Sequence, residues 1–98
     1  MRELRFEWDP RKAAANRRKH GVGFEEAHSA FADEHALLIT DPDHSEAEDR
    51  FILLGLSAAL RVLVVVHCYR ARDAVIRIIS ARKADPQERE RYVRRWQR

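Results

Sequence analysis

The sequence is short of the residues that would cross-link a small protein or hold it in a membrane. It has one cysteine, Cys68, so it can form neither an internal disulfide nor a zinc site built from several cysteines. No apolar run approaches the roughly eighteen residues of a membrane-spanning helix, and no apolar signal segment stands near the N-terminus. We therefore expect a soluble protein, most simply a cytoplasmic one, that makes no use of a membrane.

One stretch also lacks positive charge. Residues 24–49 contain nine Asp or Glu and no Lys or Arg. Residues 1–23 carry seven Lys or Arg against three acids, and residues 70–98 carry ten against four. The small net charge of +3 therefore hides a segregated one. Basic ends suit a phosphate-bearing partner, and an acidic middle suits a different, basic one.

A chain of 98 residues with 45% hydrophobic residues is enough for a single domain, residues 1–98, with one modest core. Alternation of apolar and charged residues predicts a short strand over residues 4–8. Asp9 and Pro10 are typical of a helix start, and the helix should run over residues 11–19. Gly21 supplies the left-handed residue that ends it.

Two more helices carry start signals. Gly23 is a passable N-cap for a second helix, and Glu26 stands where its side chain reaches back to the Gly23 N–H. The last helix has a stronger signal, with Asp85 as N-cap, Pro86 at the first position and Glu88 placed for a capping box.

Four further strands are predicted over residues 36–40, 50–56, 60–69 and 74–84. The last is rich in β-branched residues and is expected near the middle of the sheet. Short connections favour an antiparallel meander, so the element order is β-α-α-β-β-β-β-α. The fold class is α+β: an antiparallel sheet, two N-terminal helices packed on one face, and a C-terminal helix.

Strand alternation sorts side chains between the two faces of this sheet. We expect the helices to cover a face that carries Phe51, Val64 and Ile78. The uncovered face then carries Arg50, His67, Tyr69 and Arg77. Arg82 is out of phase with Arg77, so it joins them only through a bulge or at the end of the strand. A solvent-facing arginine and a buried structural histidine remain the simpler alternatives for Arg77 and His67.

Arginines beside a group that titrates near neutrality match the needs of RNA phosphodiester cleavage. Guanidinium groups stabilise the charge of the phosphorane, and the titrating group moves protons. If the 2′-hydroxyl of the RNA is the nucleophile, neither a metal nor a cofactor is needed. The competing reading is a divalent metal site on the acidic turn, at Asp41, Asp43 and His44 with Glu46 and Glu48 nearby. A solvated acidic loop is the more common use of such a run.

Three stretches in order carry a family resemblance: FEWDPRKAAANRRKHGVGFEEA, DPDHSEAEDRFILLGLS and RIISARKA, the last followed by a helix with the pattern E-R-x-Y. Together they resemble the BrnT toxins over roughly residues 6–92. The resemblance implies a fold similar to RelE and a metal-independent ribonuclease that inhibits translation. It also implies neutralisation by a BrnA-like ribbon-helix-helix antitoxin, through which the complex would bind operator DNA.

The predicted site combines these arguments. We expect four residues in the catalytic cleft: Arg50, His67, Arg77 and Arg82. Four more are candidate substrate contacts: Lys12, His20, Lys83 and Tyr92. A surface cation, a helix cap and a core anchor are the simpler roles for Lys12, His20 and Tyr92. The alternative function is a catalytically inactive RNA- or antitoxin-binding module that acts as transcriptional co-repressor, and growth arrest on induction would favour the enzyme.

Overall fold

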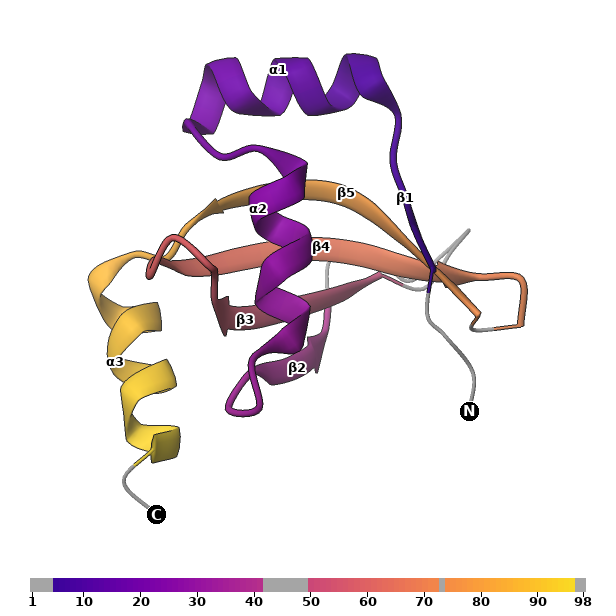
Figure 1. Ribbon diagram of the computed structural model, residues 1–98. Coiled ribbons are helices and arrows are strands. Elements are labelled where there is room, and N and C mark those ends of the chain that lie inside the picture. The colour runs from indigo at the N-terminus through magenta and orange to yellow at the C-terminus, as the bar shows by residue number, and fades with distance from the viewer. Residues whose placement is uncertain (1–4, 42–49, 73, 97–98) are drawn as a thin grey trace.

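The computed structural model describes residues 5–41, 50–72 and 74–96 (Figure 1). Its elements are β1 (Arg5–Glu7), α1 (Pro10–His20), α2 (Phe24–Ser29), a 3₁₀ turn η1 (Ala30–Ala32), β2 (Leu37–Thr40), β3 (Phe51–Leu56), β4 (Val62–Arg70), β5 (Val75–Lys83) and α3 (Pro86–Trp96). The predicted order of elements is confirmed. None of the helices in these described ranges has the length and apolar content needed to span a bilayer.

The five strands form one sheet in the order β1-β5-β4-β3-β2. The strands β2 to β5 are antiparallel to their neighbours, as the meander predicts. The prediction of a wholly antiparallel sheet is wrong for β1, which pairs parallel to β5 over Val75–Arg77. These two strands are joined through all the other strands rather than by a hairpin, so no tight turn forces them to run in opposite directions.

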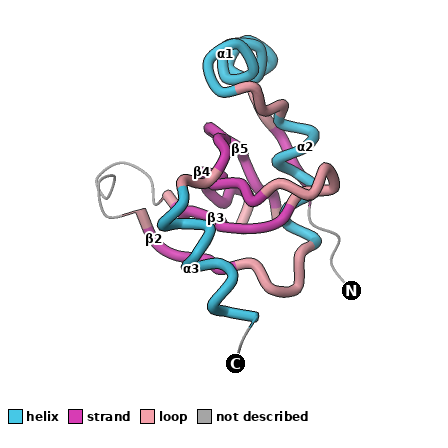
Figure 2. Tube along the Cα trace, turned by 90° about the vertical axis from the view of Figure 1, so that its left-hand side faces the viewer, coloured by secondary structure: helices cyan, strands magenta, loops and turns pink. Residues whose placement is uncertain are grey.

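The main core lies between the sheet and the N-terminal helices. Figure 2 shows α2 on one side of the strands, with α1 beyond it at the edge of the sheet. Phe24 and Ala27 of α2 are fully buried against Leu53, Leu63 and Val65 of the sheet. Phe6, Trp8 and Phe31 pack against the same cluster. The two N-terminal helices thus pack on one side of the sheet, α2 over its face and α1 at its β5 edge.

The C-terminal helix packs on the opposite face. Tyr92 of α3 is 3% exposed and contacts Leu54 and Val64. Its hydroxyl donates a hydrogen bond to Asp33, which also accepts from the backbone N–H groups of Leu56 and His35. Burial, together with Asp33, raises the pKa of Tyr92 to about 12. The structure shows the core role of Tyr92, and its contact with a substrate stays a prediction.

Three predicted helix signals are confirmed. Oδ1 of Asp9 accepts a hydrogen bond of 2.8 Å from the backbone N–H of Arg11 at the start of α1. Gly21 ends α1 with φ +70°, a conformation that favours glycine. Asp85 and Glu88 form the reciprocal capping box of α3, with both hydrogen bonds at 2.8 Å.

Gly23 is the N-cap of α2, as predicted, but the half of a capping box assigned to Glu26 is wrong. Glu26 does not reach back to Gly23, which has no side-chain cap. Its carboxylate instead pairs with the guanidinium of Arg61 and accepts a 2.7 Å hydrogen bond from Ser57 Oγ. Arg61 is the stronger partner, because both groups of this pair are ionised and the guanidinium donates two hydrogen bonds to the carboxylate. Arg61 lowers the pKa of Glu26, and the contact ties α2 to the β3–β4 turn.

Asn16 fastens α1 to the edge of the sheet. It is the one residue of α1 that is buried. Its side-chain amide donates to the Ala81 carbonyl at 2.8 Å and accepts from the Ala81 N–H at 3.1 Å. A third bond, of 2.9 Å, runs to the Val22 carbonyl. Asn16 therefore takes the place of a neighbouring strand where β5 extends beyond β1.

Candidate active site on the open face of the sheet

A β-bulge in β5 aligns its two arginines. The β4–β5 register shifts between Val66 and His67, which leaves Ile79 as the extra residue of β5. On one side of the shift Arg82 pairs with Val64, and on the other side Arg77 pairs with Cys68. Val64 and Cys68 lie on the same side of β4. The two arginines thus share the face opposite α2. The predicted requirement for a bulge is confirmed.

More side chains fall on this face. Glu7 of β1 is the parallel partner of Arg77, and Cys68 of β4 is its antiparallel partner. Arg50 comes directly before Phe51, and continuing the β3–β4 register places it beside Cys68. We call the residues Glu7, Arg50, Cys68, Arg77 and Arg82 the arginine face. Among the described residues, α3 packs on the Arg82 end of this face, through the cluster around Leu54 and Val64 and through Glu88, away from the Glu7–Arg77 end.

Carboxylates of the chain balance the charges of both strand arginines. Arg77 Nη1 donates to Glu7 Oε2 at 2.8 Å, and Arg70 Nε lies 3.9 Å from the same oxygen. Arg82 forms two hydrogen bonds to Glu88, of 2.8 and 2.9 Å. These partners raise the pKa of each of the two guanidinium groups. Both arginines remain within reach of a ligand, since their side chains are 30% and 43% exposed.

His67 does not lie on the arginine face. It pairs with Phe51 and Ile78 under the N-terminal helices, where it is fully buried. Its ring centroid is 4.8 Å from that of Phe31, and its Nδ1 is 3.2 Å from the Val65 carbonyl oxygen. The prediction failed because it placed Val64 under the helices. A shift of one residue in β4 moves every side chain to the other face.

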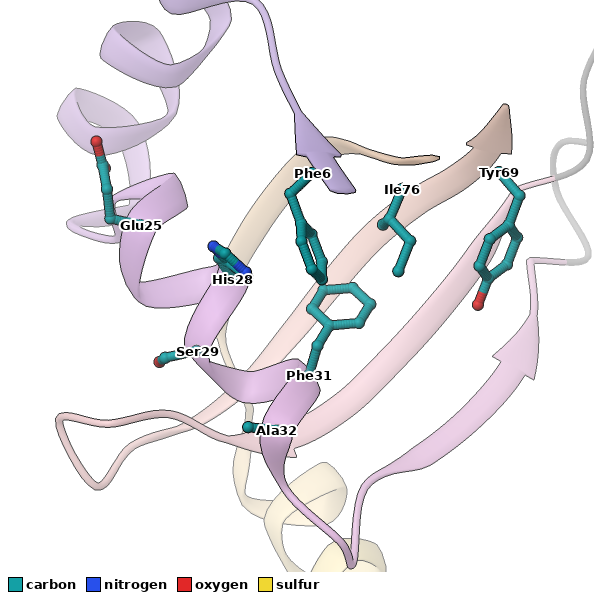
Figure 3. A pocket seen from close by; sticks show the side chains of 8 residues that line it. All are labelled: Phe6, Glu25, His28, Ser29, Phe31, Ala32, Tyr69 and Ile76. Carbon is teal, nitrogen blue, oxygen red and sulfur yellow. The ribbon is translucent and has the colours of Figure 1, made fainter. Parts of the chain in front are cut away.

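Tyr69 follows His67 onto the helix-covered face, beside a pocket of about 530 Å³ (Figure 3). Aromatic and aliphatic side chains make up most of its wall, and its eight lining residues include no arginine or lysine. They are Phe6, Glu25, His28, Ser29, Phe31, Ala32, Tyr69 and Ile76. This lining therefore has no guanidinium or ammonium group to balance a phosphate charge. The arginine face is therefore the candidate site for chemistry on RNA.

The predicted contacts of the first helix lie on an exposed basic surface. Lys12 is exposed and His20 is half-buried at the C-terminal end of α1. The exposed cations of this helix are Arg11, Lys12, Arg17, Arg18 and Lys19. Figure 1 shows α1 at the β5 side of the sheet, away from α3. We call these five cations the α1 basic surface.

Lys83 is separated from the arginine face. It pairs with Leu63, whose side chain is fully buried under the helices, so the alternation of β5 directs Lys83 to the helix-covered side. It is exposed at the end of the strand. Of the eight predicted site residues, the fold brings Arg50, Arg77 and Arg82 to one face.

A family model described as "Ribonuclease toxin, BrnT, of type II toxin-antitoxin system" matches residues 8–88. The chain belongs to the BrnT family. The crystal structure of the BrnT ribonuclease toxin of Brucella abortus has a similar fold, with a TM-score of 0.57 and 24% sequence identity. That match covers 85% of this chain and 99% of the other. A search of curated proteins gave no match.

The BrnT match supports the family and the fold that the sequence motifs predicted. The family is one of ribonuclease toxins of type II toxin–antitoxin systems. The wider similarity to RelE stays a prediction.

The alternative metal site falls largely outside the described residues. Asp41 is described, whereas Asp43, His44, Glu46 and Glu48 belong to residues 42–49. Among the residues whose positions are described, no three His, Cys, Asp or Glu side chains gather in a group suited to a metal ion.

The sequence reading missed Glu7. A signal for it was present, since the alternation of the first strand places Glu7 opposite Phe6 and Trp8. What alternation alone does not give is the parallel pairing with β5, which brings Glu7 beside Arg77.

Proposed function

We propose that this BrnT family member is a metal-independent endoribonuclease that cleaves mRNA and so inhibits translation. The observation that carries the proposal is the arginine face, where a bulge and the strand register gather Arg50, Arg77 and Arg82. Guanidinium groups bind phosphate through paired hydrogen bonds and stabilise the additional charge of a phosphorane. Family membership supports RNA as the substrate.

The chemistry that fits this face uses the substrate as its own nucleophile. The 2′-oxygen attacks the adjacent phosphorus, the bond to the 5′-oxygen breaks, and the products end in a 2′,3′-cyclic phosphate and a 5′-hydroxyl. The arginines bind the phosphate oxygens in this scheme, so no metal or cofactor takes part. The α1 basic surface would add affinity for the RNA backbone, with a strong dependence on salt.

A type II family implies an antitoxin partner. We propose a BrnA-like ribbon-helix-helix protein that neutralises the toxin and carries the complex to operator DNA. The natural place of action would be the cytoplasm, where mRNA is translated.

The test is an alanine substitution on the arginine face against a matched one elsewhere. Arg77→Ala should lower the cleavage rate roughly 10²- to 10³-fold, because it removes a donor aimed at the transition-state charge. Arg77→Lys should restore part of the rate, since a single ammonium cannot make the bidentate contact. Arg94→Ala is the control, because Arg94 pairs with Glu90 on the exposed side of α3. Full activity of Arg77→Ala, with an unchanged circular dichroism spectrum, would remove Arg77 from the site.

One observation favours the second candidate, an inactive binding module. Arg77 and Arg82 already have carboxylate partners in Glu7 and Glu88, which a phosphate must displace or share. Growth arrest on induction separates the two functions. An inactive module would bind RNA or the antitoxin without stopping growth.

A further inference from the structure

We propose that Glu7 is the general base of the cleavage reaction, the group that takes the proton from the 2′-hydroxyl. This inference rests on the proposed ribonuclease function, which requires such a base on the arginine face. The sequence suggested His67 for proton transfer, and the fold removes His67 from that face. The task must therefore belong to another group.

The position of Glu7 suits the task. Its side chain is 43% exposed, on an edge strand at the end of the arginine face that α3 does not cover. It lies 2.8 Å from Arg77, so a phosphate bound by Arg77 would lie next to the carboxylate. Arg77 and Arg70 approach the same oxygen, Oε2.

The other candidates among the described residues fit less well. Cys68 shares the row with Arg77, but its side chain is 2% exposed. Glu88 uses Oε1 for both Arg82 and the Asp85 N–H, and Oε2 for Arg82 again. It is therefore committed to holding α3 on the strand. Glu7 combines exposure with contact to the phosphate-binding arginine.

The step balances without any added reagent. A carboxylate oxygen of Glu7 takes the 2′-hydroxyl proton as the 2′-oxygen forms its bond to phosphorus. The phosphorus–O5′ bond breaks, and the leaving 5′-oxygen takes a proton from water. Glu7 returns its proton to solvent before the next turnover. Arg77 has two roles in this scheme, because it binds the phosphate and keeps Glu7 in place.

Substitution can distinguish a base from a residue that only positions Arg77. Glu7→Gln keeps the length of the side chain and an oxygen that accepts from Arg77, but it cannot take a proton at neutral pH. Glu7→Asp keeps a carboxylate that is one methylene shorter. A base predicts that Asp retains more activity than Gln, whereas a positioning residue predicts the reverse. The control is Glu90→Gln, which makes the same charge change on the exposed side of α3.

We expect Glu7→Gln to lower the single-turnover rate on a short RNA by about 10²- to 10⁴-fold, with little change in KM. The acidic limb of the wild-type rate profile against pH should also be absent in this variant. Glu90→Gln should cleave like the wild type, and circular dichroism should report folded protein throughout. A Glu7→Gln protein that keeps its rate and its acidic limb would overturn the proposal. Wild-type protein that binds the RNA without cleaving it would instead overturn the proposed function.

Discussion

At the scale of single residues, we expect the buried His67 to make the stability of the protein depend on pH. It is fully buried among aromatic rings, and burial lowers its pKa from the ordinary value near 6.5. The unfolded chain therefore takes up a proton at a higher pH than the folded one. Above about pH 6.5, His67 should not make the free energy of unfolding change with pH. Below that value, the free energy of unfolding should fall as the pH decreases toward the pKa that His67 has in the folded protein.

Chemical unfolding at several pH values between 7 and 5 measures this slope. His67→Leu replaces the imidazole by an apolar side chain of similar volume and should flatten it. His28→Gln is the control, because His28 is exposed and should leave the slope as in the wild type. A His67→Leu protein with the wild-type slope would show that the dependence arises elsewhere.

The same residue shows the limit of reading faces from sequence. Leu63, Val64 and Val65 are all buried, so hydrophobicity does not say which of them lies under the N-terminal helices. The need for a bulge before Arg82 could be predicted, because Arg77 and Arg82 are an odd number of residues apart in one strand. Side chains at that separation point to opposite faces unless a bulge intervenes. The face of His67 could not, because it depends on the register between β4 and its neighbours.

At the scale of elements, two contacts hold α3 in place: the hydrogen bond from Tyr92 to Asp33, which follows η1, and the pair of Glu88 with Arg82 of β5. Tyr92→Phe removes the hydroxyl donor and leaves the ring. It should lower the free energy of unfolding by roughly 1–3 kcal/mol, since the acceptor is a charged and partly buried carboxylate. Urea unfolding measures the change.

The cleavage rate of Tyr92→Phe separates an anchor from a substrate contact. Because the hydroxyl is buried against Asp33, the rate should equal that of the wild type at a temperature where both proteins are folded. A large fall in rate with unchanged stability would return Tyr92 to the active site.

An element's contacts could be predicted from the sequence when the contacting residues lie close together along the chain. The caps at Asp9, Gly21 and Asp85 are contacts within a few residues, so the sequence sufficed for them. The pairing of Glu26 with Arg61 joins positions 35 residues apart, and local pattern favoured the nearer partner, Gly23. Asn16 appears in a family motif, yet its role as a substitute strand depends on where β1 stops.

At the scale of the whole molecule, the segregated charge bears on how an antitoxin neutralises the toxin. A partner that covers the arginine face would offer acids to its arginines, as charge-assisted pairs. Changing Arg82 and Lys83 to Glu should then weaken antitoxin binding. Arg82 lies on the arginine face, whereas Lys83 lies on the opposite face. Arg82→Glu should therefore weaken antitoxin binding more than Lys83→Glu does. Surface plasmon resonance with the single variants measures it.

If the antitoxin covers the arginine face, added salt should slow its association with the toxin. RNA and antitoxin should then also compete for the toxin. Because Arg82→Glu would face Glu88 and loosen α3, Glu88→Gln is the matched control for that disturbance. An antitoxin that at saturation abolishes cleavage but leaves RNA binding untouched would require a conformational mechanism instead.

Under the proposed function, the arginine face cleaves RNA by using the neighbouring 2′-hydroxyl and no metal. The most direct test is cleavage of a short RNA in excess EDTA, beside the same oligonucleotide with a single 2′-deoxy residue at the cleaved position. We expect the RNA to be cut to a 2′,3′-cyclic phosphate at the rate seen without EDTA, and the deoxy substrate to stay intact. Activity that is lost in EDTA and restored by Mg²⁺ would contradict the account and direct attention to Asp41, Asp43 and His44.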